Sequence, residues 1–352
     1  MKDLLAKLVA GQTLSINQSV KVFEQIMSGQ VSAAQLGAML ALIQSRGATV
    51  EEITGAATVM RQKATAVSVP AHLTVIDTCG TGGDHASTFN ISTAAAIVAG
   101  AAGRPQNVAV AKHGNRSVTS LSGSSQVFEA LGVKLRVTSQ TLSRCLDEAG
   151  LCFCFAPAHH PAMKHAMPVR GELGFRTIFN VLGPLTNPAG AKRQVMGVFS
   201  AELTDPIAQV LGRLGSEQAM VVHGSLGGRN AAGLDELTTT GPTRVSHLRH
   251  GQVETIEVDA TSLGLRPAEV KDLQVDSPGT SAELIRAILS GQAGAPRDIV
   301  CLNSAAALLV AGVAADLQEG LQLASEVVDN GSAAATLDKL IALTAADPSP
   351  AA

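Results

Sequence analysis

The chain has 352 residues, a formal net charge of −3, and neither Trp nor Tyr. This length is enough for two domains. The acidic balance and the missing rings argue against a nucleic-acid partner held in a basic groove or by base stacking. The longest apolar runs, 94–103 and 305–315, fall far short of the roughly 20 residues that cross a bilayer, so we expect no membrane partner.

The five cysteines are an odd number and lie along apolar runs, which is the pattern of reduced, buried thiols. The first residues carry charges within their apolar run and no cleavage-like site, unlike a signal peptide. Both observations favour a cytoplasmic location.

Up to Pro70 the sequence predicts helices alone. Apolar residues recur at helical spacing, and Thr49 is followed by Glu52 in a capping-box pattern. The expected helices begin with a face formed by Leu4, Leu5 and Leu8 and continue over 15–27, 33–45 and 50–63.

From Leu73 on, short strands alternate with helices, which predicts a mostly parallel sheet covered by helices on both faces. Segment 157–188 breaks this rhythm, and we expect it to pack back onto the N-terminal helices. Segment 234–259 predicts β-hairpins at a sheet edge. The expected strands are 73–77, 107–111, 134–137, 151–156, 195–199 and 219–223. The expected helices are 93–102, 124–131, 142–149, 161–167, 173–181, 206–214, 282–289 and 305–318.

A glycine-rich turn between the first expected strand and the next helix is the clearest sign of a ligand site. Glycines let backbone N–H groups turn inward, and hydroxyls gather where the helix begins, which suits a phosphate or pyrophosphate. An ordinary strand-to-helix connection has the same pattern, and the turn is neither a Walker A loop nor a dinucleotide fingerprint. The turn comprises Asp77-Thr78-Cys79-Gly80-Thr81-Gly82-Gly83-Asp84, followed by Ser87-Thr88-Phe89-Asn90-Ile91-Ser92-Thr93.

A basic segment, Lys112-His113-Gly114-Asn115-Arg116-Ser117, directly follows the next expected strand. In open parallel sheets, ligands bind beyond the carboxyl ends of the strands. Taken alone, such a segment is more often a solvated basic turn. If the two strands are neighbours in the sheet, however, its cations and the glycine-rich turn converge on one anion.

Two further segments carry groups suited to a ligand or a metal. His159, His160 and His165 invite a zinc site, but no carboxylate lies at helical spacing among them. Arg170 fits a clamp for a carboxylate or phosphate as well as it fits a surface arginine. Asp235-Glu236 alone is an acidic turn, but beside a pyrophosphate site its two carboxylates would suit Mg²⁺.

Together and in this order, these segments resemble the anthranilate phosphoribosyltransferase family. The resemblance implies an α/β protein with a small all-helical domain, a larger domain with a central, mostly parallel sheet flanked by helices, and an active site in the interdomain cleft. The helical domain would span 1–72, completed by about 166–190; the α/β domain would span 73–165 and 191–347, with a tail at 348–352. The matching motifs are 80–84, 90–93, 112–117, 123–124, 160–163, Arg170, 183–188 and 235–236.

The resemblance also implies a Mg²⁺-dependent enzyme of tryptophan biosynthesis. It would transfer the 5-phosphoribosyl group of phosphoribosyl pyrophosphate (PRPP) to the amine of anthranilate and release pyrophosphate, and it would form a homodimer through the helical domain. No general base is evident. PRPP would be held by Gly80, Gly83, Asp84, Thr88, Asn90, Ile91, Ser92, Thr93, Lys112, His113, Gly114, Asn115, Arg116, Ser117, Val118, Thr119, Ser120 and Ser124. Anthranilate would be bound by Gly80, His113, Asn115 and Arg170, and Mg²⁺ by Ser92, Asp235 and Glu236.

The chain departs from the family pattern at His85, which occupies a position usually small, at Ser87, which replaces a common Asn, and at Gly171, where a second Arg often follows. None of these changes removes a ligand named above. Two alternatives share the fold. A pyrimidine nucleoside phosphorylase would use inorganic phosphate and need no Asp-Glu pair, and a nucleic-acid binder would need a basic groove.

Overall fold

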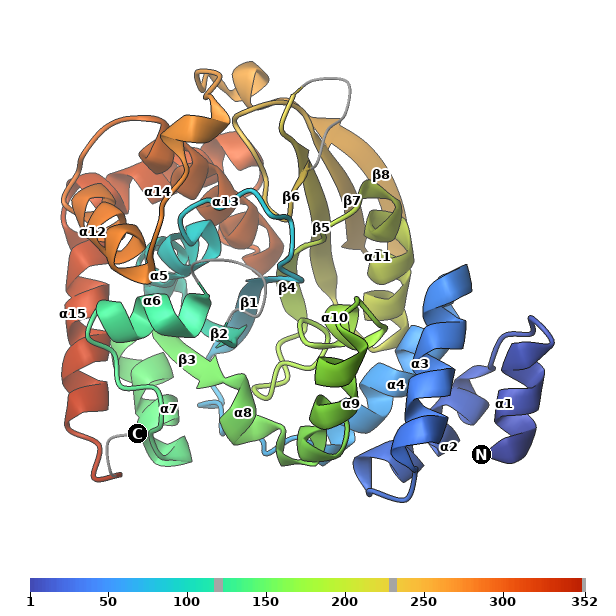
Figure 1. Cartoon of the computed structure of the whole chain (residues 1–352). Helices are drawn as coiled ribbons and strands as arrows, with labels where there is room; N and C mark the ends of the chain where they lie inside the picture. Colours follow the sequence, from blue (N-terminus) through green and yellow to red (C-terminus); the bar gives the residue numbers. More distant parts are fainter. Residues whose placement is uncertain (117–122, 228–232, 350–352) are drawn as a thin grey trace.

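The structure is a computed structural model, and it describes residues 1–116, 123–227 and 233–349. The N-terminal part consists of helices, as the sequence predicts (Figure 1). Three of them begin with a capping box, in which a Ser or Thr hydroxyl and a Gln or Glu side chain bind each other's backbone N–H. These helices are α1 (Lys2–Val9), α2 (Ile16–Met27), α3 (Ala33–Arg46) and α4 (Val50–Lys63).

The rest of the chain is built around a twisted sheet with the strand order β3-β2-β1-β4-β5-β7-β8, and β6 pairs with β5. The strands from β3 to β5 are parallel, whereas β6, β7 and β8 pair antiparallel. The sheet is therefore mostly parallel with a hairpin at its edge, as predicted. The strands are β1 (Thr74–Gly80), β2 (Val108–Gly114), β3 (Leu151–Phe155), β4 (Arg193–Gly197), β5 (Gln218–Ser225), β6 (Gly233–Leu234), β7 (Thr243–Arg249) and β8 (Gln252–Val258).

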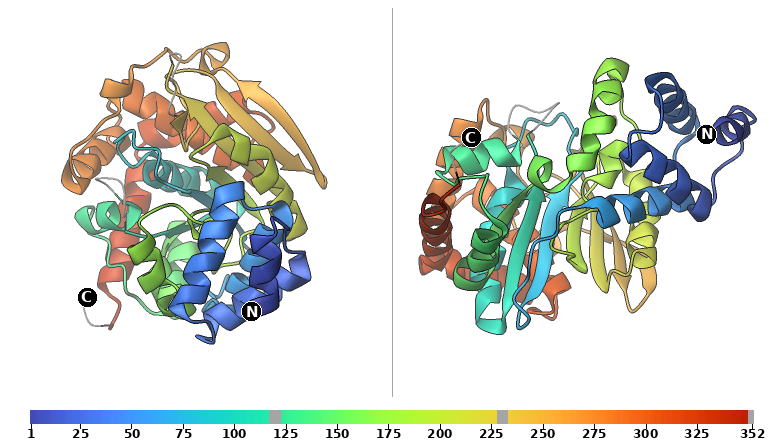
Figure 2. Two further views of the ribbon diagram at one scale, coloured as in Figure 1. Left: turned by 45° about the vertical axis from the view of Figure 1, so that its right-hand side comes forward. Right: turned by 90° about the horizontal axis from the view of Figure 1, so that it is seen from below.

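Helices cover both faces of this sheet. In the right-hand view of Figure 2, α15 lies at one end of the molecule and α1–α4 lie at the other. Successive side chains of a strand point to opposite faces. In β5, Met220 and Val222 therefore join the core under α5 and α13, whereas Ala219 and Val221 join the core shared with α11 and the N-terminal helices. The covering helices are α5 (Ile91–Gly103), α6 (Ser124–Ala130), α7 (Ser139–Arg144), α11 (Thr204–Arg213), α12 (Pro278–Leu289), α13 (Ala295–Ala311), α14 (Leu317–Asp329) and α15 (Ser332–Ala345).

The segment between β3 and β4 packs against the N-terminal helices, as expected from its broken rhythm. Val169 and Phe179 lie in the same core cluster as residues of α2, α3 and α4. The Phe179 ring meets the Phe23 ring edge-on, with 5.7 Å between centroids. The segment contains α8 (Ala156–His159), a 3₁₀ helix (Pro161–His165), α9 (Met167–Leu173) and α10 (Phe179–Leu182).

The predicted strand at 134–137 is wrong. Val133 and Leu135 are buried in alternation, which mimics a strand. The backbone here, however, binds side chains at the end of the chain rather than another strand: Lys134 N donates to Thr344 Oγ1 at 3.3 Å, and Thr138 N donates to Asp347 Oδ2 at 2.9 Å.

Two predicted helices also have the wrong extent. The helix expected over 305–318 ends at Ala311, because Gly312 takes a left-handed φ of 79° and a new helix starts at Leu317. The helix expected over 173–181 is interrupted after α9 by Gly174, whose φ is 63°. Among the described residues, no helix combines the length and apolar character that crossing a membrane requires.

A buried carboxylate fastens the N-terminal helices together. Glu52 is fully buried and accepts hydrogen bonds from Leu14 N at 2.9 Å, from Thr49 N at 3.0 Å and from the Arg46 guanidinium. We predict that Glu52→Ala lowers the free energy of unfolding by about 3 kcal/mol, because Arg46 loses its carboxylate partner and two N–H groups lose their acceptor.

Chemical denaturation measures this loss, with Glu51→Ala as the matched control. Glu51 pairs with Arg213 at 2.6 Å, but both side chains are exposed, so its loss should cost about 1 kcal/mol or less. Equal losses in the two variants would contradict the account of Glu52.

Candidate active site at the carboxyl ends of β1, β2 and β4

The glycine-rich turn lies where β1 ends, between its parallel neighbours β2 and β4. Thr81 N donates to Gly197 O at 2.9 Å, and Phe199 N donates to Thr81 Oγ1 at 3.0 Å, so the turn is tied to the end of β4. Gly82 and Gly83 have φ angles of 65° and 80°, a left-handed conformation that glycine adopts without steric cost.

The acidic turn at Asp235 and Glu236 lies directly on these strand ends. A Cβ on Gly80 would lie 2.3 Å from Asp235 Oδ2, and a Cβ on Gly197 would lie 1.5 Å from Asp235 O. Any other residue type at these positions would therefore displace the acidic turn. Gly82 N donates to Asp235 Oδ2 at 2.6 Å.

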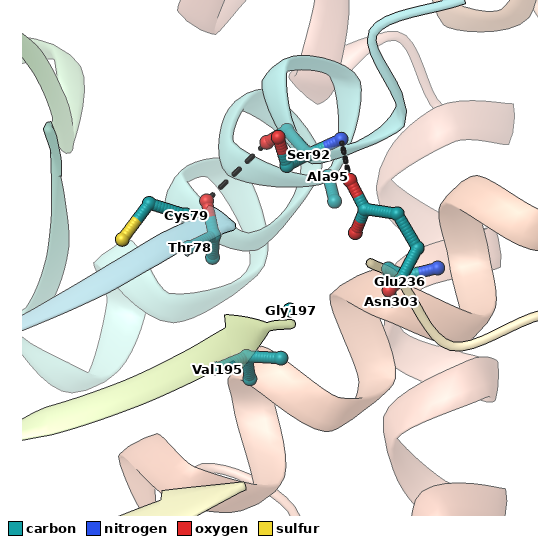
Figure 3. A pocket seen from close by; sticks show the side chains of 8 residues that line it. All are labelled: Thr78, Cys79, Ser92, Ala95, Val195, Gly197, Glu236 and Asn303. Atoms are coloured by element: carbon teal, nitrogen blue, oxygen red, sulfur yellow. Dashed lines mark hydrogen bonds between the residues drawn. The ribbon is translucent and has the colours of Figure 1, made fainter. Parts of the chain in front are cut away.

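The start of α5 completes a small hollow beside this turn (Figure 3). Ser92 N donates to Glu236 Oε1 at 3.1 Å, and Thr78 Oγ1 donates to Ser92 O at 3.3 Å. From the other side, the buried Asn303 holds the acidic turn by bonding both the N–H and the carbonyl of Leu237. The hollow is lined by Thr78, Cys79, Ser92, Ala95, Val195, Gly197, Glu236 and Asn303.

Lys112 reaches this site from β2 and is buried, with 1% of its surface exposed. Its Nζ donates to Ser92 Oγ at 3.0 Å and to the Thr78 carbonyl. Burial lowers the pKa of Lys112, and the nearby carboxylate of Asp77 opposes that shift. Because Ser92 lies in the first turn of α5, the ammonium adds to the positive end of the helix dipole. The two together favour an anion here.

The acidic turn carries strongly perturbed carboxyl groups. Burial and the charge of Asp84 raise the pKa of Asp235 to about 7. Burial and the charge of Asp235 raise the pKa of Glu236 to about 8. Such groups, crowded together and partly withdrawn from water, gain from a nearby cation. Among the described residues, no three His, Cys, Asp or Glu side chains are placed to hold a metal ion, so a cation bound here would need further oxygens from a ligand.

Two histidines meet beside β2. His113 Nε2 and His160 Nε2 are 3.2 Å apart. Burial lowers the pKa of His113 to about 3 and that of His160 to about 4. Both rings are therefore neutral at pH 7, and the hydrogen bond between them joins β2 to the segment that leads to α9.

Arg170 projects from α9, and its guanidinium carbon lies 5.2 Å from the centroid of the Phe179 ring. Its hydrogen-bond partner in the structure is the Met167 sulfur at 3.7 Å, and burial lowers its pKa. A guanidinium stacked on a ring keeps its edge N–H groups for a planar anion.

Other predicted residues have different structural settings. Asn115 O accepts from Ser125 N and Ser124 Oγ, both at 3.4 Å, so the basic segment meets the start of α6. Ile91 and Thr93 have buried side chains, and their backbone N–H groups already donate to Phe89 and Asn90. Thr88 is half-buried and pairs with Gln274. Ser117, Val118, Thr119 and Ser120 lie outside the described residues.

The departures from the family pattern have different structural settings. His85 and Ser87 have φ angles of 60° and 56°, which are uncommon for residues with a side chain. A Cβ on Gly171 would meet no atom within 4 Å, so this position of α9 is open.

Sequence reasoning missed Arg176 and Asn303, and both contact the site. Arg176 donates to the Gly83 carbonyl, and Asn303 holds the acidic turn from α13. The signal for Asn303 was an amide within an otherwise apolar helix, since a buried polar group requires a partner. Arg176 had no local signal beyond its position close to Arg170.

Two family models match the chain in the order of its two parts. Residues 2–64 match the helical bundle domain of a glycosyl transferase family, and residues 72–334 match the a/b domain of a family with that name. Fold and site thus define a glycosyl transferase.

Similar proteins identify the family within this class of glycosyl transferases. The chain is 50% identical to the anthranilate phosphoribosyltransferase of Parvibaculum lavamentivorans, over 97% of each chain. It is 49% identical to that of Rhodospirillum rubrum, over 99% of this chain and 97% of the relative. This chain belongs to the anthranilate phosphoribosyltransferase family.

Solved structures agree. The anthranilate phosphoribosyltransferase of Thermus thermophilus matches with a TM-score of 0.89 and 39% identity, over 97% of this chain and 99% of that one. The enzyme of Saccharomyces cerevisiae, in complex with PRPP and Mg, matches with a TM-score of 0.86 and 27% identity, over 97% and 96%.

The raised carboxyl pKa values predict how stability changes with pH. In the folded protein the pKa of Asp235 is about 7 and that of Glu236 about 8, against 3.8 and 4.5 as ordinary values. Between these limits the folded state holds protons that the unfolded state has released, so stability should fall as pH rises from about 5 to about 8.

Thermal unfolding midpoints in EDTA, recorded across this pH range, test the prediction. Glu236→Gln should flatten the decline, whereas Glu254→Gln, a change on the exposed face of β8, should leave it unaltered. A decline as steep in Glu236→Gln as in the wild type would refute the prediction.

Proposed function

We propose that this chain transfers the 5-phosphoribosyl group of PRPP to the amine of anthranilate and releases pyrophosphate, as a step of tryptophan biosynthesis. The observation that carries the proposal is the meeting of three groups at neighbouring strand ends: the glycine-rich turn, the buried Lys112 under α5, and the acidic turn. The relatives named for this activity support the reaction, and the PRPP and Mg in the yeast complex support the substrate and the metal.

PRPP would lie over the glycine-rich turn and the start of α5. The helix N-terminus and the Lys112 ammonium together provide positive potential for its phosphates. As pyrophosphate leaves the anomeric carbon, positive charge builds on the ribose ring and negative charge on the leaving group. Groups fixed in place before the reaction stabilise that charge without reorganising.

Asp235, Glu236 and Ser92 fit a magnesium site, because they offer hard oxygen ligands beside the proposed pyrophosphate position. A cation bound beside these two carboxyl groups would offset the burial and mutual repulsion that raise their pKa values, and it would favour their ionised forms. Mg²⁺ bound there would help to neutralise the leaving pyrophosphate.

Anthranilate would bind on the side of α9, with its carboxylate on Arg170 and with Gly80, His113 and Asn115 around the ring. The half-buried guanidinium has no carboxylate partner among the described residues, which supports this role. The amine of anthranilate is neutral at pH 7, so the attack requires no strong base. Much of the catalysis would come from holding the amine beside the anomeric carbon.

We also propose the domain division and the assembly. Residues 1–72 with about 166–190 would form the helical domain, and 73–165 with 191–347 the α/β domain; the core shared by α2, α3, α4, α9 and α10 supports this grouping. The reaction would take place in the cleft between the domains. A cytoplasmic homodimer joined through the helical domain follows from the family resemblance.

The assay that tests the function mixes purified protein, PRPP, MgCl₂ and anthranilate and follows the loss of anthranilate fluorescence. Omission of PRPP or of MgCl₂ should abolish the loss. A second arm offers thymidine and inorganic phosphate. Cleavage of thymidine with no loss of anthranilate would replace the proposal with a nucleoside phosphorylase activity.

We predict that Arg170→Ala raises the KM for anthranilate by about tenfold to a hundredfold, because a charge-assisted bidentate hydrogen bond is lost. The KM for PRPP should change much less. Steady-state kinetics with each substrate varied in turn measure the effect. The control is Arg144→Ala, which removes an exposed arginine paired with Glu148 and should change neither KM. Equal rises in the two KM values of Arg170→Ala would contradict the binding of the anthranilate carboxylate by Arg170.

A further inference from the structure

Arg176 bridges the two parts of the molecule at the glycine-rich turn. It lies between α9 and α10, in a segment whose next apolar residues, Ile178 and Phe179, belong to the core shared with the N-terminal helices. Its guanidinium, however, contacts Gly83 and Phe199, in the segments that follow β1 and β4. The side chain thus connects the segment that carries Arg170 to the proposed PRPP turn.

The guanidinium contacts both an aromatic ring and a backbone carbonyl. Its central carbon is 4.2 Å from the centroid of the Phe199 ring. A Cβ on Gly83 would lie 3.3 to 3.7 Å from three atoms of the guanidinium, which also donates to the Gly83 carbonyl. Phe199 N is itself bonded to Thr81 Oγ1 at 3.0 Å. Arginine, ring and turn therefore form one closed set of contacts.

The direction of the Gly83 carbonyl fixes the direction of the next N–H group. In a trans peptide the carbonyl and the following N–H point to opposite sides, and the structure contains no cis peptide among the described residues. Since the Gly83 carbonyl points to Arg176, the Asp84 N–H points away from it. That N–H has no acceptor among the described residues, so it is available to a ligand oxygen.

We propose that Arg176 is a positioning residue for PRPP: it holds the Gly83 carbonyl and thereby presents the Asp84 N–H as a donor to the phosphates. This inference rests on the proposed function. Phe199 supports the guanidinium from beneath, because a planar cation stacks on an aromatic face. A lysine could reach the carbonyl but has no planar cation to stack on the ring.

Equilibrium binding of PRPP in the presence of MgCl₂, measured by calorimetry without anthranilate, tests the proposal apart from turnover. Arg176→Met should weaken PRPP binding about tenfold, which corresponds to about 1.4 kcal/mol, and Arg176→Lys should recover part of that loss. Arg193→Met is the matched control. Arg193 also donates to a backbone carbonyl, that of Ala311 at 2.6 Å, but it lies at the start of β4 and therefore at the opposite edge of the sheet. This variant should bind PRPP as the wild type does.

Kinetics separate positioning from a general loss of structure. At saturating PRPP, the kcat of Arg176→Met should stay within about threefold of the wild type while the KM for PRPP rises. If Arg176→Met does not fold, Phe199→Leu, which removes the ring and leaves the arginine, should still weaken PRPP binding. Wild-type affinity for PRPP in Arg176→Met would overturn the inference, and so would equally weak binding by Arg193→Met. If Arg176→Met does not fold, wild-type affinity in Phe199→Leu would overturn it instead. A wild-type protein that binds no PRPP would instead overturn the proposed function.

Discussion

The site depends on the close approach of the acidic turn to two glycines at the ends of β1 and β4. Gly80 and Gly197 have no Cβ, so Asp235 lies against the backbone there and accepts a hydrogen bond from Gly82. This contact joins a turn that follows β6 to a turn that follows β1, although about 150 residues separate them in sequence. Gly80 and Gly197 are neighbours because the parallel strands β1 and β4 end at the same edge of the sheet, and the acidic turn reaches this edge through β6, which pairs antiparallel with the end of β5.

The same contact creates an electrostatic balance that favours the ligands of the proposed reaction. Asp235 and Glu236 are crowded together, so a cation between them would relieve their repulsion. Lys112 is buried under the first turn of α5 and has the opposite requirement, since an anion would offset its charge. A magnesium pyrophosphate group supplies both charges at once. The neutral His113 and His160 add no charge on the side where anthranilate would enter.

Much of this arrangement could be predicted from the sequence, because local signals determine it. Capping boxes begin α2, α3 and α4, and the glycine-rich turn and the basic segment each follow an apolar strand. Local signals could not show which strands pair with each other. Nor could they show where a strand-like segment forms hydrogen bonds with distant side chains instead of with another strand. Residues 134–138 have a strand-like pattern but bind Thr344 and Asp347, more than 200 positions later. Arg176 likewise donates to a carbonyl 93 positions earlier in the chain, and the periodicity of the sequence cannot predict such a contact.

PRPP binding by Gly197→Ala, with MgCl₂ present, tests most directly whether the site depends on the close approach of the acidic turn to the end of β4. The added methyl would lie 1.5 Å from the Asp235 carbonyl oxygen, so the acidic turn must move away from the site. Gly279→Ala is the control, because its methyl meets no atom closer than 3.7 Å. Gly197→Ala should keep its helix and sheet content by circular dichroism but bind PRPP at least about tenfold more weakly, while Gly279→Ala should bind PRPP as the wild type does. Wild-type affinity for PRPP in Gly197→Ala would contradict this dependence.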